Sequence, residues 1–104
     1  LYMETFGEYI RNLRNQNSLT LTQLAAKLDL DSANLSKIEN GKREFDEKRL
    51  DKLAIVFNLN IESLRQEYFS DIIAKKVYDN NCSEGILILA EEKVKYLQQQ
   101  KDTL

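Results

Sequence analysis

The sequence contains no histidine and no proline, and it has a single cysteine, Cys82. Without histidine, acid–base catalysis by an imidazole is excluded, and one cysteine alone forms neither a zinc site nor a Cys–His nucleophile pair. Cys82 also has no partner for a disulfide within the chain, which favours a reducing compartment. We therefore expect no enzyme, no metal site and no cofactor, and no small-molecule ligand is evident.

Glycine and long apolar runs are also scarce. The three glycines, Gly7, Gly41 and Gly85, are too far apart to form a phosphate-binding loop. No stretch approaches the ~20 apolar residues of a membrane span, and the first residues lack a secretory signal's basic flank and apolar run. We expect a cytoplasmic protein without a membrane partner. Met3 is a candidate native start, which would make Leu1 and Tyr2 additional residues.

The net charge of −2 argues mildly against a nucleic-acid partner, because such proteins usually carry a basic face. The charges are unevenly distributed, however. Between residues 32 and 43, Lys37, Lys42 and Arg43 stand against Glu39 alone. A small basic patch of this kind can dock on phosphates, although an ordinary solvated face would have the same composition.

The 104 residues predict one all-α domain of modest core size. Apolar residues recur at helical spacings of three and four, and no strand-like alternation is sustained. Capping boxes begin helices at Thr5, with Glu8, and at Thr20, with Gln23. Further helices are expected over 32–40, after a cap at Asp31, then after Asp46, and after Asn60.

The second and third of these helices are short and are separated by a turn of about three residues, which is the helix-turn-helix layout. Leu35 and Ile38 would point into the core. Gly41 is placed to end the third helix in a left-handed conformation. The outward face of this helix would then enter a DNA major groove.

The stretch "LTLTQLAAKLDLDSANLSKIENGKR", residues 19–43, resembles the phage-repressor/Cro-like (XRE) helix-turn-helix family. The resemblance extends through "IRNLR" before it and "LDKLAIVFNLNIESL" after it. It implies a five-helix repressor-like DNA-binding domain over residues 3–65. Residues 66–104 would form a two-helix C-terminal extension.

The resemblance also implies roles for individual residues. The base-reading residues would be Ser32, Ala33, Ser36 and Lys37. The residues at the DNA backbone would be Thr22, Asn34, Asn40, Lys42 and Arg43, of which Arg43 is also a candidate to reach a groove. Arg14 and Glu39 resemble the family's partly buried ion pair, which ties the first helix to the third.

Two positions depart from the family pattern. Leu21 occupies a position where glutamine commonly supports DNA contact, and Asp29 occupies one where glycine is frequent. Aspartate tolerates positive φ, so the turn can form, but Asp29 and Asp31 should weaken binding by their charge near phosphates. Because Ser32 and Ala33 are short, DNA shape would supply part of the specificity.

The extension carries two apolar stripes of helical spacing. They consist of Phe69, Ile73 and Val77, and of Leu87, Ala90, Val94 and Leu97. Asn80 and Asn81 separate them, and Asn81 with Glu84 forms a further candidate capping box. We favour packing of these stripes across two chains, since such regulators bind two half-sites as dimers. The alternative is that the extension folds back onto its own domain.

The sequence thus predicts a homodimeric, sequence-specific transcriptional regulator of bacterial or phage origin, located at the nucleoid. It would act as a repressor or a restriction–modification controller-like protein on a two-fold symmetric operator. The alternative is an antitoxin-type protein-interaction module, whose tail neutralises a toxin and whose DNA binding is autoregulatory. A folded, tight homodimer without a partner would favour the first interpretation.

Overall fold

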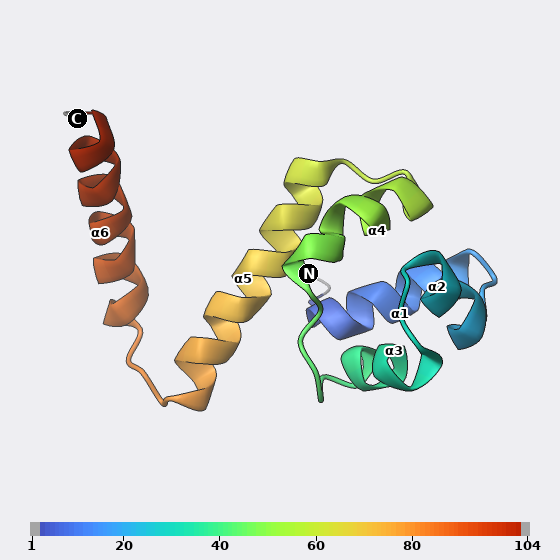
Figure 1. Ribbon diagram of the computed structural model, residues 1–104. Coiled ribbons are helices and arrows are strands. Elements are labelled where there is room, and N and C mark those ends of the chain that lie inside the picture. The colour runs from blue at the N-terminus through green and yellow to red at the C-terminus, as the bar shows by residue number, and fades with distance from the viewer. Residues whose placement is uncertain (1–2, 103–104) are drawn as a thin grey trace. The chain divides into compact units, whose positions relative to one another are not determined.

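The computed structural model describes residues 3–102, so the question of whether Leu1 and Tyr2 are native lies outside the described residues. Regular structure in this part of the chain is entirely helical, which confirms the all-α prediction (Figure 1). The elements are α1 (Phe6–Gln16), α2 (Leu21–Lys27), α3 (Ser32–Glu39), a 3₁₀ turn η1 (Glu47–Arg49), α4 (Leu50–Phe57), α5 (Ile61–Asp79) and α6 (Gly85–Asp102). The chain divides after Asp71 into two compact units.

The helix starts of the first unit follow the predicted caps. The Thr5 hydroxyl accepts from the Glu8 N–H at 3.1 Å, and the Glu8 carboxylate accepts from the Thr5 N–H at 2.9 Å. Thr20 and Gln23 repeat this reciprocal arrangement at the start of α2. Each box satisfies two donors that a helix N-terminus otherwise leaves unpaired, which explains why such short helices begin where they do.

Left-handed residues follow α3 and α4, and the one at Gly41 was predicted. Gly41 follows α3 with φ 75°, and Asn58 ends α4 with φ 52°. Asp29, in the turn between α2 and α3, has φ 56°, so aspartate does take the conformation for which glycine is frequent in this family. These residues stop the helices sharply and keep the connections short.

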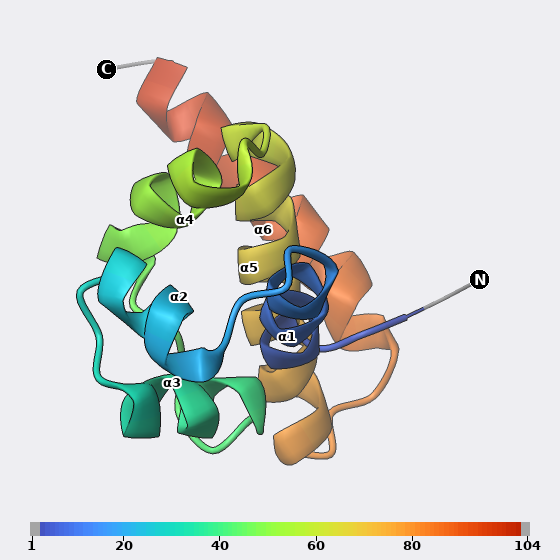
Figure 2. The ribbon, with the colours of Figure 1, turned by 90° about the vertical axis from the view of Figure 1, so that its right-hand side faces the viewer.

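The first unit surrounds an aliphatic core. Figure 2 shows α1, α2, α3, α4 and the first half of α5 arranged around a common centre. The fully buried side chains are those of Ile10, Leu24, Leu28, Leu35, Leu50, Leu53 and Leu64. Each contributes roughly 1.5–3 kcal/mol through removal of its surface from water. This core holds α2 and α3 in place from behind.

The helices α1 and α3 approach each other closely at Gly7. A Cβ atom at this position would lie 2.3 Å from the Ile38 carbonyl oxygen and 2.9 Å from that of Glu39. Only a hydrogen atom fits there. The lack of a side chain at Gly7 therefore sets how near α3 lies to α1.

The structure corrects three details of the sequence interpretation. The fifth helix and the first tail helix are a single helix, α5, so the predicted domain boundary at 65/66 falls inside it. No glycine, proline or capping residue interrupts helix formation there. Asp46 is a cap as predicted, accepting from the Lys48 N–H, but the turn that it opens is a 3₁₀ turn and α4 begins only at Leu50. Asn81 has φ 52° and α6 begins only at Gly85, so the predicted cap at Asn81 is wrong.

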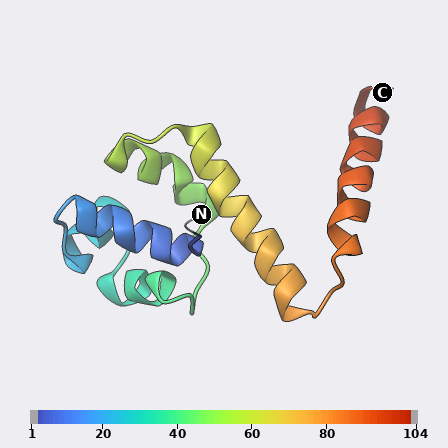
Figure 3. The ribbon, with the colours of Figure 1, turned by 180° about the vertical axis from the view of Figure 1, so that it is seen from behind.

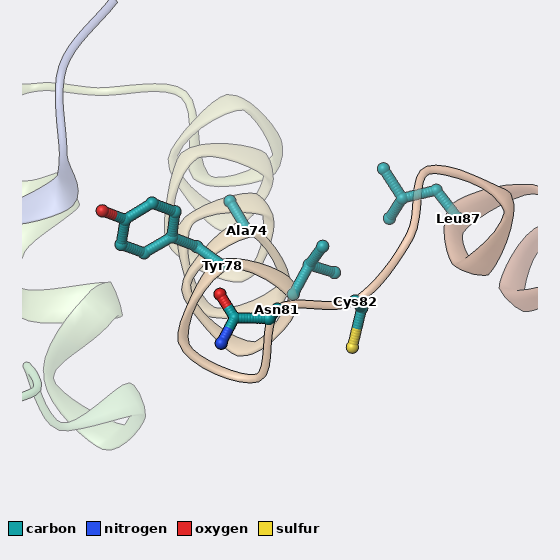
Figure 4. Close-up of a pocket in the computed structure, with 6 residues that line it drawn as sticks. Ala74, Tyr78, Asn81, Cys82 and Leu87 are labelled. Atoms are coloured by element: carbon teal, nitrogen blue, oxygen red, sulfur yellow. The ribbon is translucent and has the colours of Figure 1, made fainter.

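The second unit consists of the last turns of α5, a short link and α6 (Figure 3). Every residue from Ser83 to Lys101 is exposed. A hollow of about 520 Å³ lies at the link. Figure 4 shows Ala74 and Tyr78 on α5, Asn81 and Cys82 on the link, and Leu87 on the first turn of α6. None of the helices in the described part of the chain is both long enough and apolar enough to cross a bilayer.

Candidate nucleic-acid interface

The pair α2–α3 is built from short amphipathic helices. Leu24 and Ala25 of α2 and Leu35 and Ile38 of α3 are buried, which turns the remaining faces outward. The Leu30 N–H donates to the Ala25 carbonyl at 2.9 Å, closing the connection between the helices. A compact turn therefore fixes the angle at which α3 leaves α2.

Arg49 and Lys52 hold this turn from outside it. Arg49 donates through Nε to the Leu28 carbonyl at 3.0 Å and through Nη2 to the Asp29 carbonyl at 3.2 Å. The Lys52 ammonium pairs with the Asp29 carboxylate, and this hydrogen bond holds the pKa of Asp29 below its ordinary value. The negative charge of Asp29 is thus partly neutralised, which reduces its expected cost near DNA. Sequence reasoning missed both cations because they lie about 20 residues away.

Glu39 is buried at the end of α3, with only 3% of its surface exposed. Arg14 donates to its two oxygens, through Nε at 2.7 Å and through Nη2 at 2.9 Å. The same guanidinium donates to the Leu19 carbonyl at 3.1 Å. Hydrogen bonding to Glu39 raises the pKa of Arg14. The pair predicted from the sequence therefore links α1, the loop before α2, and α3.

Arg11 is a second arginine at this carboxylate, and no sequence pattern predicts its contact with Glu39. Its Nε lies 3.4 Å from a Glu39 oxygen, and its Nη2 donates to the Asn40 side-chain oxygen. One carboxylate thus faces two guanidinium groups. The excess positive charge lies at the exposed edge beside Asn40, where a phosphate contact is predicted.

The outward face of α3 carries the predicted base-reading residues. Ser32, Ala33 and Lys37 are exposed, and Ser36 is half-buried. No hydrogen bond or ion pair within residues 3–102 engages the Lys37 side chain. Leu35, Ile38 and Glu39 occupy the opposite side of the same helix. A rigid helix thus presents short side chains and one long cation to solvent.

The predicted backbone-contacting residues border this face. Thr22 is exposed on the first turn of α2. Lys42 is exposed just beyond α3, and Asn40 reaches back to the Ser36 hydroxyl at 3.5 Å. Asn34 and Arg43 are joined by a hydrogen bond of 2.9 Å. These side chains lie at both ends of the α2–α3 pair.

The predicted dimer-interface residues are largely uncovered. Phe69 and Val77 are half-buried, and the others, exposed, are Ile73, Leu87, Ala90, Val94 and Leu97. Tyr68, rather than Phe69, is the aromatic of this stretch that enters the core of the first unit. In the described part of the chain, no cluster of three or more His, Cys, Asp or Glu side chains could hold a metal ion.

A helix-turn-helix family model matches residues 10–64. The HTH-type transcriptional repressor RghR of Bacillus subtilis (strain 168) is 32% identical over 109 residues, covering 91% of this chain and 81% of the relative. The control protein C.MunI of Mycoplasma sp is 35% identical over 68 residues, covering 64% and 86% of the two chains.

Among solved structures, the complex of the SinR and SinI proteins contains a similar chain. The TM-score is 0.50 at 23% identity, with 92% of this chain and 97% of that chain covered, and this likeness supports the fold alone. The family model and the sequence relatives agree with the geometry of α2 and α3. The chain belongs to the XRE-type helix-turn-helix family of DNA-binding transcriptional regulators.

Proposed function

We propose that this regulator is a homodimeric repressor that reads a two-fold symmetric operator with α3 in the major groove. The observation that carries the proposal is the two-sided character of α3. One side of the helix is buried in the domain through Leu35, Ile38 and Glu39. The other side is exposed and carries Ser32, Ala33 and Lys37. A rigid helix with a free polar face is the geometry by which this motif reads bases.

Positively charged side chains around α3 support the proposal that contacts with DNA phosphates contribute to the affinity for DNA. Lys42 and Arg43 follow the helix, and Arg11 adds a cation beside Asn40. Lys37 is the long donor on the reading face, and lysine donates readily to guanine O6 and N7. Lys52 pairs with Asp29, which partly offsets one of the acidic charges near this surface.

Dimerisation through the second unit is supported by its exposed apolar surface. Leu87, Val94 and Leu97 on α6 are 51%, 52% and 63% exposed. Leaving such side chains in water forgoes the gain of burial, whereas a second chain would cover them. Two reading helices could then engage half-sites about 34 Å apart, which roughly doubles the phosphate contacts. Bound to DNA, such a dimer acts at the nucleoid in the cytoplasm.

The similarity to a control protein supports the narrower possibility of a restriction–modification controller, since that match covers 86% of the relative. The exposed tail also supports the antitoxin-type alternative, in which another protein covers α6. The two possibilities differ in the state of the purified chain. A homodimer requires no partner to cover its tail, and an interaction module does.

Selection of bound DNA from a random library, with the purified chain and light scattering on the same sample, tests the proposal. We expect a two-fold symmetric motif and a mass twice the 12.1 kDa of one chain. A monomer that selects no motif would contradict the proposal. A monomer that selects a single half-site would contradict the dimer alone and favour the interaction-module alternative.

A further inference from the structure

The side chain of Arg43 is folded back onto α3. Arg43 lies four residues beyond the end of the helix at Glu39, yet its Nη1 donates to the side-chain oxygen of Asn34 at 2.9 Å. Asn34 is the third residue of α3. The guanidinium is therefore drawn back to the first turn of the reading helix, beside Asn34.

Asn34 is itself held in one orientation. Its Nδ2 donates to Asp31 Oδ2 at 2.9 Å, and its backbone N–H donates to Asp31 Oδ1 at 2.7 Å. Asp31 caps α3, so its carboxylate position is fixed by the helix start. The chain of contacts runs from the cap through the amide of Asn34 to the guanidinium of Arg43.

This arrangement leaves most of the guanidinium available. An arginine has five N–H donors in a planar fork, and the contact with Asn34 involves Nη1 alone. The remaining donors can meet the O6 and N7 atoms of a guanine bidentately.

The outward face of α3 has few side chains long enough to donate hydrogen bonds to DNA bases. Ser32, Ala33 and Ser36 are short, and Lys37 is the helix's one long cation. The N-terminal residues of a reading helix are the ones that face base edges. A guanidinium held at this end would supply the bidentate contact that the helix itself lacks.

We infer that Arg43 is a base-reading residue, and that Asn34, fixed by Asp31, is the positioning residue that holds it there. This inference rests on the proposed function, because it assigns a specificity determinant to the same surface. Asn34 then acts through Arg43 rather than by its own contact with the DNA backbone, and the Asp31 carboxylate contributes to reading instead of only repelling phosphates.

The experiment measures relative affinities for an operator library with wild type and with Arg43→Ala, Arg43→Lys, Asn34→Ala and Lys42→Ala. Arg43→Ala should reduce discrimination about tenfold to a hundredfold at one guanine position per half-site. Arg43→Lys keeps the charge but lacks the planar fork that can hold Asn34 and meet a base at the same time, so it should lose part of this discrimination. Asn34→Ala should lose about threefold to tenfold at the same position.

Lys42→Ala is the matched control, since it removes a neighbouring cation whose side chain makes no hydrogen bond or ion pair to α3 among the described residues. It should weaken binding to all sequences alike and lower the salt dependence by about one unit of slope. Asn34→Ala keeps the backbone N–H that donates to Asp31, so circular dichroism should show unchanged helix content.

The outcomes separate this inference from the proposed function. Uniform weakening of all operators by Arg43→Ala, with wild type still selecting its motif, would assign Arg43 to phosphate and overturn the inference alone. Unchanged discrimination in Asn34→Ala would remove Asn34 as the positioning residue. Failure of the wild type to select any motif would overturn the proposed function, and this inference with it.

A measurement without DNA examines the contact itself. In the free protein, Arg43→Ala should shift the side-chain amide ¹⁵N and ¹H resonances of Asn34, and Lys42→Ala should not. Equal spectra for the wild type and Arg43→Ala at Asn34 would show that the guanidinium is not held there. That result would overturn the inference even if the chain binds its operator.

Discussion

Glu39 and Arg14 are joined by two hydrogen bonds, of 2.7 Å and 2.9 Å, across the contact between α1 and α3. The Glu39 side chain is almost fully buried, and the Arg14 side chain is 14% exposed. Since α3 is the proposed reading helix, this pair connects the stability of the domain to the orientation of its DNA-binding surface.

Glu39→Ala should lower the free energy of unfolding by about 3–5 kcal/mol, because it leaves Arg14 partly buried without its carboxylate. Arg11→Ala is the control at the same carboxylate. Arg11 is 38% exposed and lies 3.4 Å away, so its loss should cost under about 1 kcal/mol. Urea unfolding followed by circular dichroism measures both. Equal losses for the two variants would contradict the assignment of Arg14 as the main partner.

Gly7→Ala should destabilise the domain by about 1–3 kcal/mol or more, because the new Cβ would meet backbone oxygens of Ile38 and Glu39 that cannot move aside. The matched control is Gly85→Ala on α6, where the nearest atom is the Ser83 Oγ at 3.9 Å. This change should be neutral or slightly stabilising. Thermal melts compare the two variants, and a tolerated alanine at Gly7 would refute the close approach of α1 and α3.

Tyr68 connects α5 to the segment after α3, since its hydroxyl donates to the Phe45 carbonyl at 2.6 Å. Tyr68→Phe would leave that carbonyl without its donor and should cost about 1–3 kcal/mol. Tyr78→Phe is the control, because Tyr78 is 82% exposed and its hydroxyl should be dispensable. Denaturant midpoints at neutral pH provide the comparison.

Tyr68 should also make the stability of the domain depend on pH in the alkaline range. Burial, followed by the nearby Glu44 carboxylate, raises the pKa of Tyr68 to about 12 from its ordinary value of 10.0. The unfolded chain therefore releases this proton first as the pH rises. The stability that Tyr68 contributes is fully present below pH ~10 and is lost progressively between ~10 and ~12. Unfolding measured from pH 8 upward should show a smaller alkaline loss in Tyr68→Phe than in wild type, and identical slopes would contradict this assignment.

The local features of the fold could be predicted from the sequence, because they depend on residues close together in the chain. Thr5 with Glu8 forms a cap by itself, and Gly41 and Asn58 end helices through their own conformational freedom. The pairing of Arg14 with Glu39 was also expected, but only through the family resemblance. Neither composition nor periodicity relates an arginine on the first helix to an acid 25 residues later.

The features that sequence reasoning missed depend on contacts between distant segments. In the sequence, Gly7 is only a weak helix former, and its close contact with α3 is visible only in the folded chain. Tyr68 was missed because helical periodicity favoured its neighbour Phe69 as the apolar residue of this stretch. The continuity of α5 depends on tertiary packing, since Leu64 and Tyr68 on the same helix are both buried in the first unit. Arg49 and Lys52 reach the turn at Asp29 through the folded structure alone, so only the three-dimensional arrangement reveals them.

Dimerisation through α6 predicts that Leu87→Asp with Val94→Asp yields a monomer of 12.1 kDa that binds DNA weakly. Charged side chains on this face would oppose burial against a second chain. Ile88→Asp with Tyr96→Asp is the matched control, because helical geometry places these two exposed residues away from the Leu87–Val94 face. Light scattering should show a monomer for the first pair and a dimer for the second. A dimer in both would refute the α6 interface.

The reading role of α3 is tested most directly by repeating the DNA selection with Lys37→Ala beside wild type and a Lys93→Ala control on α6. We predict that Lys37→Ala folds normally and selects a motif in which one base position per half-site has become degenerate. Discrimination at that position should fall by about 1–3 kcal/mol, while Lys93→Ala should select the wild-type motif. An unchanged motif for Lys37→Ala would contradict the assignment of this face of α3 as the base-reading surface.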